Sequence, residues 1–152
     1  MKFCIQCGQD LAQTTREIKS PQIGAHLFTA QAPTLKCSHC GLEIVDGPSV
    51  ERFEVLVAQE LIESGVRTGA TLRYVRKILD LRANELAELL DVKPETISRW
   101  ENDKVAPDRI VLAVLGGLIT DQLSHRTETI DRLRRLSEPK KLEPTVRISL
   151  RS

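Results

Sequence analysis

The hydrophobic positions divide the chain into two parts with different periods. Before residue 47, apolar residues fall in short β-prone stretches at 16–18, 26–29, 34–36 and 42–45, punctuated by Pro21, Gly24 and Pro33. From residue 47 onward they recur every three or four positions, which is typical of amphipathic helices. The pattern therefore predicts an α+β protein, with a small β-rich module in front and helices behind it.

The first predicted helix joins the two parts. Gly47 and Pro48 mark a boundary, and Ser49 is the predicted N-cap because its hydroxyl can accept a hydrogen bond from the first helical turn. The helical spacing is carried by Phe53, Leu56, Val57 and Leu61 and lasts until Gly65. We interpret residues 47–68 as a linker helix, with a hinge at 67–70 where Gly69 lies.

Behind the linker, the spacing predicts a run of short helices. They cover residues 72–79, 83–90, 95–102 and 108–120, and Pro94 suits the first turn of the third because its missing N–H has no partner there. A further helix carries Leu123, Ile130, Leu133 and Leu136 on one side, and Pro139 stops it before a basic tail. The predicted domains are 1–46, 47–68, 69–120 and 121–152.

The cysteines supply the clearest chemistry in the sequence. They form two Cys-x-x-Cys pairs, each followed by a glycine: Cys4 and Cys7 before Gly8, and Cys37 and Cys40 before Gly41. Tetrahedral zinc takes four thiolates, and two short knuckles can supply two each whatever the length of chain between them. The glycines fit because the residue after a knuckle needs a tight bend, often with positive φ. The pattern predicts one Zn²⁺ per chain, holding the front module together.

Other interpretations of the cysteines stay open at this stage. Iron also accepts four sulfurs, and the paired Cys-x-x-Cys-Gly arrangement resembles rubredoxin, although residues 1–46 hold only Phe3 and Phe28 where rubredoxin-like cores are rich in aromatics. Two disulfides would need an oxidising compartment, and redox-active chemistry normally uses one pair. We expect His26 and His39 to face solvent or to lie behind the ligands, since four thiolates already close a structural site.

Charge and hydropathy limit the functional classes. The 152 residues carry a net charge of +1, so bulk charge neither argues for a nucleic-acid partner nor excludes one, and only residues 121–152 are distinctly basic. The sequence shows no apolar signal segment at its start and no apolar run of membrane length. We therefore expect a cytoplasmic protein with no membrane partner.

A helix-turn-helix pattern covers residues 85–102. Two helices that cross steeply need a small residue where their backbones approach, here Ala87, and an apolar set that joins them. That set is Leu86, Leu90, Val92, Ile97 and Trp100. The segment, above all the run from Ile97 to Glu101, resembles the helix-turn-helix of the Xre family, which includes the lambda-type phage repressors. An ordinary corner of a helical bundle is the alternative interpretation.

The resemblance implies that the second helix enters the major groove of double-stranded DNA. Arg99 can then bridge guanine O6 and N7, Glu95 can accept from cytosine N4, and Thr96 can meet a thymine methyl group. We expect phosphate contacts from Lys93, Ser98, Asn102 and Lys104.

Two positions depart from the family pattern. Family members usually begin the first motif helix with Ser or Thr and then Gln, where this chain has Arg82 and Ala83, so Arg82 is a candidate phosphate contact instead. Asp91 replaces the usual glycine of the turn, and Asp tolerates the left-handed conformation better than most residues. The resemblance also implies a largely buried, structural ion pair between Arg76 and Glu101.

The predicted helix at 108–120 is apolar on nearly every side, which is more than one small core needs. A symmetric homodimer would cover the surplus and would place two recognition helices about 34 to 36 Å apart, matching a palindromic site. The alternative is that the segment after Thr120 simply covers this helix.

The combination of two Cys-x-x-Cys pairs with an Xre-type helix-turn-helix resembles the MqsA antitoxins, also described as carrying a YgiT-type zinc finger. The likeness covers most of residues 1–120. It implies a dimeric transcriptional regulator that binds a promoter palindrome and captures a ribonuclease toxin with its zinc module. A stand-alone Xre-type repressor whose metal module senses metal or redox state is the alternative. We do not expect an enzyme, because the sequence shows no open metal site, no nucleophile with a base, and no phosphate-cradling loop.

Overall fold

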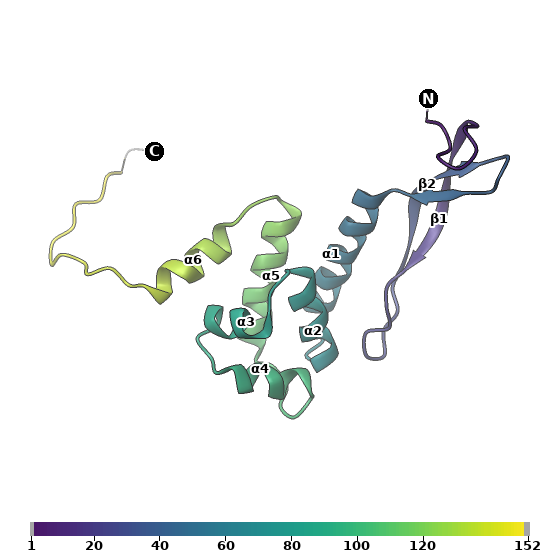
Figure 1. Cartoon of the computed structure of the whole chain (residues 1–152). Coiled ribbons are helices and arrows are strands. Elements are labelled where there is room, and N and C mark those ends of the chain that lie inside the picture. The colour runs from purple at the N-terminus through teal and green to yellow at the C-terminus, as the bar shows by residue number, and fades with distance from the viewer. Residues whose placement is uncertain (1, 151–152) are drawn as a thin grey trace.

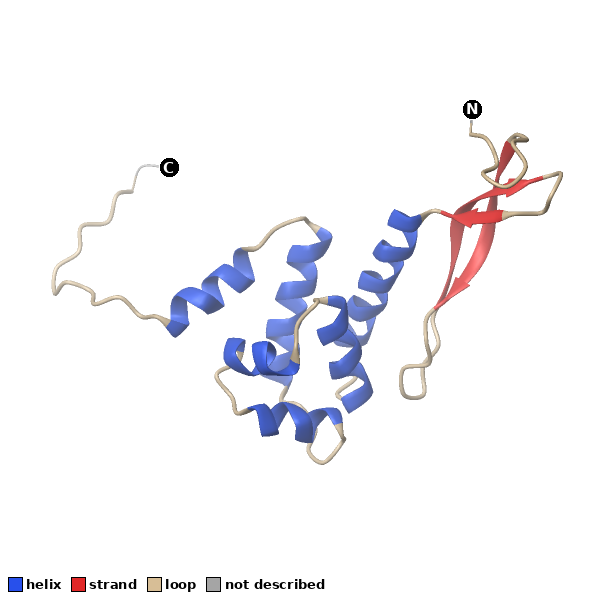
Figure 2. Ribbon diagram, in the orientation of Figure 1, coloured by secondary structure: helices blue, strands red, loops and turns tan. Residues whose placement is uncertain are grey.

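The computed structural model describes residues 2–150 as an α+β protein (Figures 1 and 2), which confirms the predicted fold class. Within these residues, a three-stranded antiparallel sheet comes first and six helices follow. The strands are β1 (Leu11–Lys19), β2 (Thr29–Cys37) and β3 (Glu43–Val45). The helices are α1 (Gly47–Glu63), α2 (Gly69–Ile78), α3 (Ala83–Leu89), α4 (Pro94–Glu101), α5 (Arg109–Leu123) and α6 (Glu128–Ser137).

The first two strands form a long hairpin. Leu11 lies opposite Cys37 at one end and Lys19 opposite Thr29 at the other, while β3 adds to the free side of β2. These strands are longer than the predicted stretches because exposed polar residues continue the ladder beyond the apolar ones. The strand predicted at 26–29 is wrong, since His26 lies in the turn and pairing begins only at Thr29.

Pro33 lies inside β2, opposite Thr15, and not between strands as predicted. In an antiparallel ladder, one residue directs its N–H and its carbonyl toward the same neighbouring strand. The Pro33 carbonyl accepts a hydrogen bond from the N–H of Asp46, at 2.9 Å, on the β3 side. An N–H at position 33 would therefore point toward β3 and not toward β1. Pairing with β3 begins only at Thr34, so no ladder bond needs that N–H. The hairpin accommodates the proline without losing a bond between β1 and β2.

Helix α1 begins at Gly47, earlier than predicted. Asp46, not Ser49, is its N-cap, because the Asp46 carboxylate accepts hydrogen bonds from the Ser49 hydroxyl at 2.6 Å and from the Ser49 N–H at 3.0 Å. These two bonds lower the pKa of Asp46. The sequence offered two good cap residues three positions apart, and the charged one takes the role.

One apolar core unites the helices. Its buried members include Leu72 and Val75 of α2, Leu86 of α3, Ile97 of α4 and Ile119 of α5. Val55 and Ala58 of α1 also belong to it, so the predicted linker helix packs as part of the helical body. Helix α5 buries five of its apolar residues, Val111, Leu112, Leu115, Leu118 and Ile119, and all of them except Leu112 belong to this core. Much of its predicted surplus is therefore covered within one chain, by α1 and α6.

The helix ends share one geometry. A residue with positive φ lies two positions after the last residue of each helix from α1 to α5, and only α1 has a glycine there. These residues are Gly65, Asp80, Asp91, Asp103 and His125. In each case the next N–H reaches back to a carbonyl in the last turn, as the Val92 N–H does to the Ala87 carbonyl at 3.0 Å. The left-handed conformation predicted for Asp91 is confirmed, with φ of 52°.

The turn between β1 and β2 lies beside the helices (Figure 1) and packs on them through apolar side chains. Ile23 is 3% exposed and packs with Val57 and Leu61 of α1, and Phe28 joins the same cluster. The hairpin is therefore anchored to α1 at the end opposite its cysteines.

Helix α6 packs on α5 and α3, and the chain after it runs away from the helices in extended form (Figure 1). The Thr129 N–H donates to the Asp121 carboxylate at 2.6 Å, which fixes the first turn of α6. Residues 134–150 are exposed throughout. Among the described residues, no helix has the length and apolarity needed to cross a membrane.

Candidate metal centre and helix-turn-helix

The two Cys-x-x-Cys knuckles fold alike. In the first, the Gly8 N–H donates to the Cys4 carbonyl at 2.8 Å; in the second, the Gly41 N–H donates to the Cys37 carbonyl at 3.0 Å. Both glycines have positive φ, 74° and 75°, as the sequence predicted. Each tight turn directs the backbone N–H groups of its knuckle toward the sulfurs, which favours thiolates.

The hairpin register brings the two knuckles together. Cys37 ends β2, and the first knuckle lies directly before β1, so all four sulfurs meet at one end of the hairpin. The Sγ atoms of Cys4 and Cys40 are 3.5 Å apart, as are those of Cys7 and Cys37, and all four lie within 4.8 Å of one another. Tetrahedral ligation at about 2.3 Å requires sulfurs about 3.8 Å apart. The four cysteines are therefore placed to bind one metal ion.

Backbone N–H groups and neighbouring thiols set the charges in this cluster. The N–H groups of Cys40 and His39 lower the pKa of Cys37 to about 6. The N–H of Gln9 favours the Cys7 thiolate, but burial and the adjoining Cys37 raise the pKa of Cys7 to about 12. Four adjacent thiolates repel one another, and a bound cation relieves that repulsion as it displaces the protons.

The histidines lie outside the metal cluster. His39 is exposed between the cysteines of the second knuckle, and His26 is exposed in the hairpin turn at the other end of the sheet. Cys4 and Cys37 are buried, at 3% and 0% exposure, whereas Cys40 is exposed. The site therefore opens to solvent at Cys40.

The helix-turn-helix consists of α3, a four-residue turn and α4. Ala87 is buried where the two helices approach, and Ile97 and Trp100 anchor the inner side of α4 in the core. Pro94 occupies the first turn of α4, as predicted. This packing fixes the rotation of α4 about its axis.

Glu95, Ser98, Arg99 and Asn102 lie on the side of α4 that faces away from the core, and all four are exposed. Thr96 is half-buried beside them, and Arg82, Lys93 and Lys104 are exposed around the motif. The Asn102 amide donates to the Ser98 carbonyl at 2.7 Å. Within residues 2–150, no hydrogen bond or ion pair engages the Arg99 side chain.

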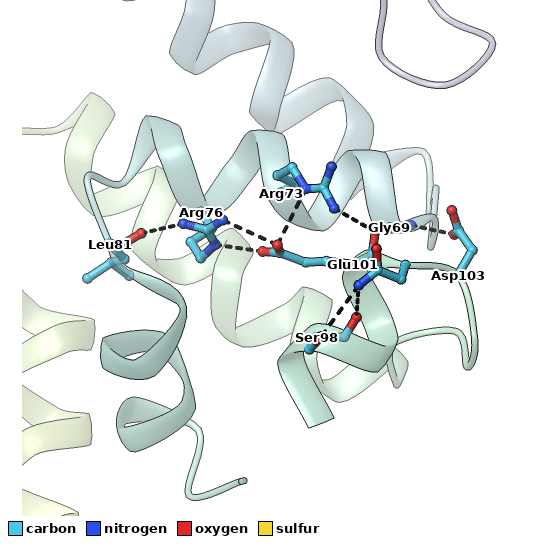
Figure 3. Close-up of polar contacts among 8 residues, drawn as sticks. Gly69, Arg73, Arg76, Leu81, Ser98, Glu101 and Asp103 are labelled. Atoms are coloured by element: carbon cyan, nitrogen blue, oxygen red, sulfur yellow. Dashed lines mark hydrogen bonds and ion pairs between the residues drawn. The ribbon is translucent and has the colours of Figure 1, made fainter. Parts of the chain in front are cut away.

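The C-terminal end of α4 is tied to α2 by a polar network, drawn in Figure 3. Arg76 contacts Glu101 at 2.6 Å, which confirms the predicted pair, and it also donates to the Leu81 carbonyl at 2.9 Å. Arg73 contacts the carboxylate of Glu101 at 3.4 Å and donates to its carbonyl at 3.2 Å. The Glu101 carboxylate therefore forms ion pairs with two arginines of α2.

A second tie lies at the start of α2. The Asp103 carboxylate accepts a hydrogen bond from the Gly69 N–H at 2.6 Å. A side chain at Gly69 would collide with α4, because its Cβ would lie 2.4 Å from the Glu101 carbonyl oxygen. The sequence suggested a hinge here, and the structure shows a close contact between two helix backbones instead. Sequence reasoning missed Arg73 and Asp103, since both look like ordinary surface charges.

Residues 1–124 match the sequence model of a protein family that is described as the antitoxin component of a bacterial toxin-antitoxin system, MqsA. The chain belongs to the MqsA antitoxin family. No curated protein matches it at a significant level.

The MqsA match includes both cysteine pairs and every helix from α1 to α5. It supports a role as an antitoxin, for which a toxin is the natural partner. Helix α6 and the tail that follows lie beyond the matched residues.

Proposed function

We propose that this MqsA-family antitoxin is a homodimeric, sequence-specific DNA-binding regulator in the cytoplasm. In this proposal it represses its own promoter through a palindromic operator and neutralises a toxin. The observation that carries the proposal is the two-sided character of α4. Its inner side is fixed by Trp100 and Glu101, and its outer side presents polar side chains to solvent.

The outer side of α4 suits the edges of base pairs. Arg99 is exposed and has a side chain long enough to form the bidentate contact to guanine O6 and N7. Glu95 lies one helical turn earlier on the same side and can accept from cytosine N4, while Thr96 at the edge of that side can meet a thymine methyl group. A rigidly held helix favours such readout, because little order remains to be gained on binding.

Phosphate contacts would surround this side. Lys93 precedes α4 and Lys104 follows it, so both ammonium groups can approach the DNA backbone. Arg82, at the N-cap of α3, is held by a hydrogen bond from its own N–H to the Glu85 carboxylate at 2.6 Å, which leaves its guanidinium free to reach a phosphate. Ser98 and Asn102 complete the proposed set.

We propose zinc as the metal of the four-cysteine site. Zinc suits a closed site of four thiolates and needs no redox partner, whereas iron in the same site would add redox chemistry for which an antitoxin has no evident use. Metal analysis of protein purified without added metal tests this assignment. One zinc per chain is expected, and iron at that ratio would contradict it.

Toxin capture is proposed for the metal-bound module. Phe3 and Ile5 flank Cys4 and are 62% and 88% exposed, an unusual display of large apolar side chains beside a rigid knuckle. Co-expression with the product of a neighbouring small gene, followed by co-purification, tests the toxin part independently of DNA binding.

The decisive test of the DNA-binding part is a gel-shift with the DNA immediately upstream of the protein's own gene. Autoregulation predicts a shifted band that survives an excess of unrelated DNA. Equal competition by unrelated and upstream DNA would show that the protein does not recognise a specific sequence there.

A further inference from the structure

An apolar groove lies where α3, α5 and α6 meet. It has a volume of about 600 Å³, and its apolar lining includes Leu89, Ile110, Val114, Leu133 and Leu136. Ile110 and Leu136 are 68% and 70% exposed. Contact between water and large aliphatic side chains costs free energy in proportion to the exposed apolar area, so the groove favours an apolar occupant.

The chain's own C-terminal tail has matching chemistry. Val146, Ile148 and Leu150 alternate with polar residues, so an extended backbone places all three on one side. They are 47%, 72% and 95% exposed. Leu142, near the start of the tail, is 77% exposed as well.

We propose that residues 142–150 of a second copy of this chain occupy the groove, and that two copies exchange their tails reciprocally. The inference rests on the homodimer of the proposed function and gives that dimer an interface. The segment lies outside the residues that the MqsA family model matches.

The position of the tail favours exchange between copies over occupation of its own groove. Pro139 lines the groove, so the tail starts beside it, yet from there the chain runs away from the helices (Figure 1). To enter its own groove, the tail would have to reverse direction at once. In a two-fold dimer with the axis near this point, each tail starts beside the partner's groove and enters it without a reversal.

Charge supports the same occupant. Glu88 and Asp91 lie at the edge of the groove. Lys140 and Lys141 directly precede the occupying segment and Arg147 lies between its apolar residues, whereas Glu143 is its one acidic residue. An acidic rim attracts the two lysines that lead into the segment and the arginine within it.

Sedimentation equilibrium of the full chain tests the tail. Ile148→Asp is expected to weaken dimerisation at least about 100-fold, because a buried aliphatic contact is replaced by a charge twice in each dimer. Thr145→Asp adds the same charge to the opposite side of the extended tail and is the matched control. It is expected to change the dimer dissociation constant less than about threefold.

The groove is tested by Ile110→Asp, whose side chain is already largely exposed in one chain, so its helical content should stay at the level of the unsubstituted protein. Loss of dimer is again expected. Mixing the two variants then shows whether a tail binds the groove of the partner chain or the groove of its own chain. The Ile110→Asp chain retains a good tail and the Ile148→Asp chain a good groove, so a mixed dimer restores one of the two contacts and should form where neither variant dimerises alone.

Several results would overturn the tail exchange. They are a monomer at all concentrations, a dimer unaffected by Ile148→Asp, or a mixture no more dimeric than its components. A dimer broken instead by Ala113→Asp, at an exposed position elsewhere on α5, would place the interface on another side of that helix. None of these results depends on DNA binding. Failure of the gel-shift would contradict the proposed function, but it would leave the measured dimer dissociation constant unchanged.

Discussion

Arg76 binds both carboxylate oxygens of Glu101, with Nε 2.6 Å from Oε1 and Nη2 3.2 Å from Oε2 (Figure 3). The two side chains are only 14% and 9% exposed. A bidentate pair of this kind joins α2 to the C-terminal end of α4 with a fixed geometry. It therefore determines how α4 is presented to solvent.

Replacing Arg76 with alanine should lower the free energy of unfolding by about 3 to 5 kcal/mol, because the Glu101 carboxylate would stay buried without its main partner. Urea denaturation followed by circular dichroism measures the change. Arg73→Ala is the control, since Arg73 is 47% exposed and its contact should contribute less than about 1 kcal/mol. Equal losses in the two variants would contradict the assigned importance of burial.

Gly69→Ala should destabilise the protein by roughly 1 to 3 kcal/mol or more, because the added methyl group meets backbone atoms of α4 that cannot move aside separately. Gly47→Ala offers a matched control at the start of another helix, where nothing lies within 4 Å of the added atom. Thermal melts of both variants make the comparison. A hinge at Gly69 would instead tolerate alanine nearly as well as position 47 does.

The two aspartates with positive φ at the ends of α3 and α4 should respond in opposite ways to glycine. Asp91→Gly should stabilise the protein by about 0.5 to 1 kcal/mol, since glycine adopts the left-handed conformation without strain. Asp103→Gly gains the same relief but loses the acceptor for the Gly69 N–H, so its net effect should be destabilising. Chemical denaturation of the pair distinguishes conformational strain from the hydrogen bond.

Cys37→Ser should abolish stoichiometric metal binding and unfold the sheet, because the metal and the fold of this module form together. Hydrogen exchange is expected to show lost protection in β1 and β2, with protection retained in α2 to α5. His39→Ala, two residues away, should keep the full metal content, since His39 lies outside the sulfur cluster. Metal loss in both variants would mean that the imidazole is a ligand.

Arg99→Ala should lower specific affinity for the operator by about 1 to 3 kcal/mol and relax the preference at one base position. Lys93→Ala should weaken binding to all sequences alike and reduce its salt dependence. Binding titrations against operator variants at several salt concentrations separate the two effects. Unchanged discrimination by the Arg99 variant would show that another surface reads the bases.

Much of this fold follows from local signals in the sequence. The helices begin and end within a few residues of their predicted limits, because apolar spacing and Pro94 specify them directly. The metal cluster was equally predictable, since thiolate chemistry requires the knuckles whatever lies between them. In the sheet, polar residues such as Gln13 belong to a strand only because β2 pairs with them.

What the sequence concealed depends on contacts between distant segments. The role of Gly69 becomes visible only once α4 lies against it, and the anchoring of Ile23 on α1 only once the hairpin is folded. Pro33 was predicted to separate two strands. It can lie inside β2 because β3 begins to pair only at Thr34, which the sequence does not reveal. Tertiary packing decided each of these positions, and local propensity alone carries no signal for it.

The placement of Ile23 has a mechanical consequence. The β1–β2 hairpin is closed at one end by the sulfur cluster, and at the other end its turn packs on α1. The same helix contributes Val55 and Ala58 to the core that holds α4. A ligand that displaced Ile23 from α1 would therefore act on a helix that supports α4.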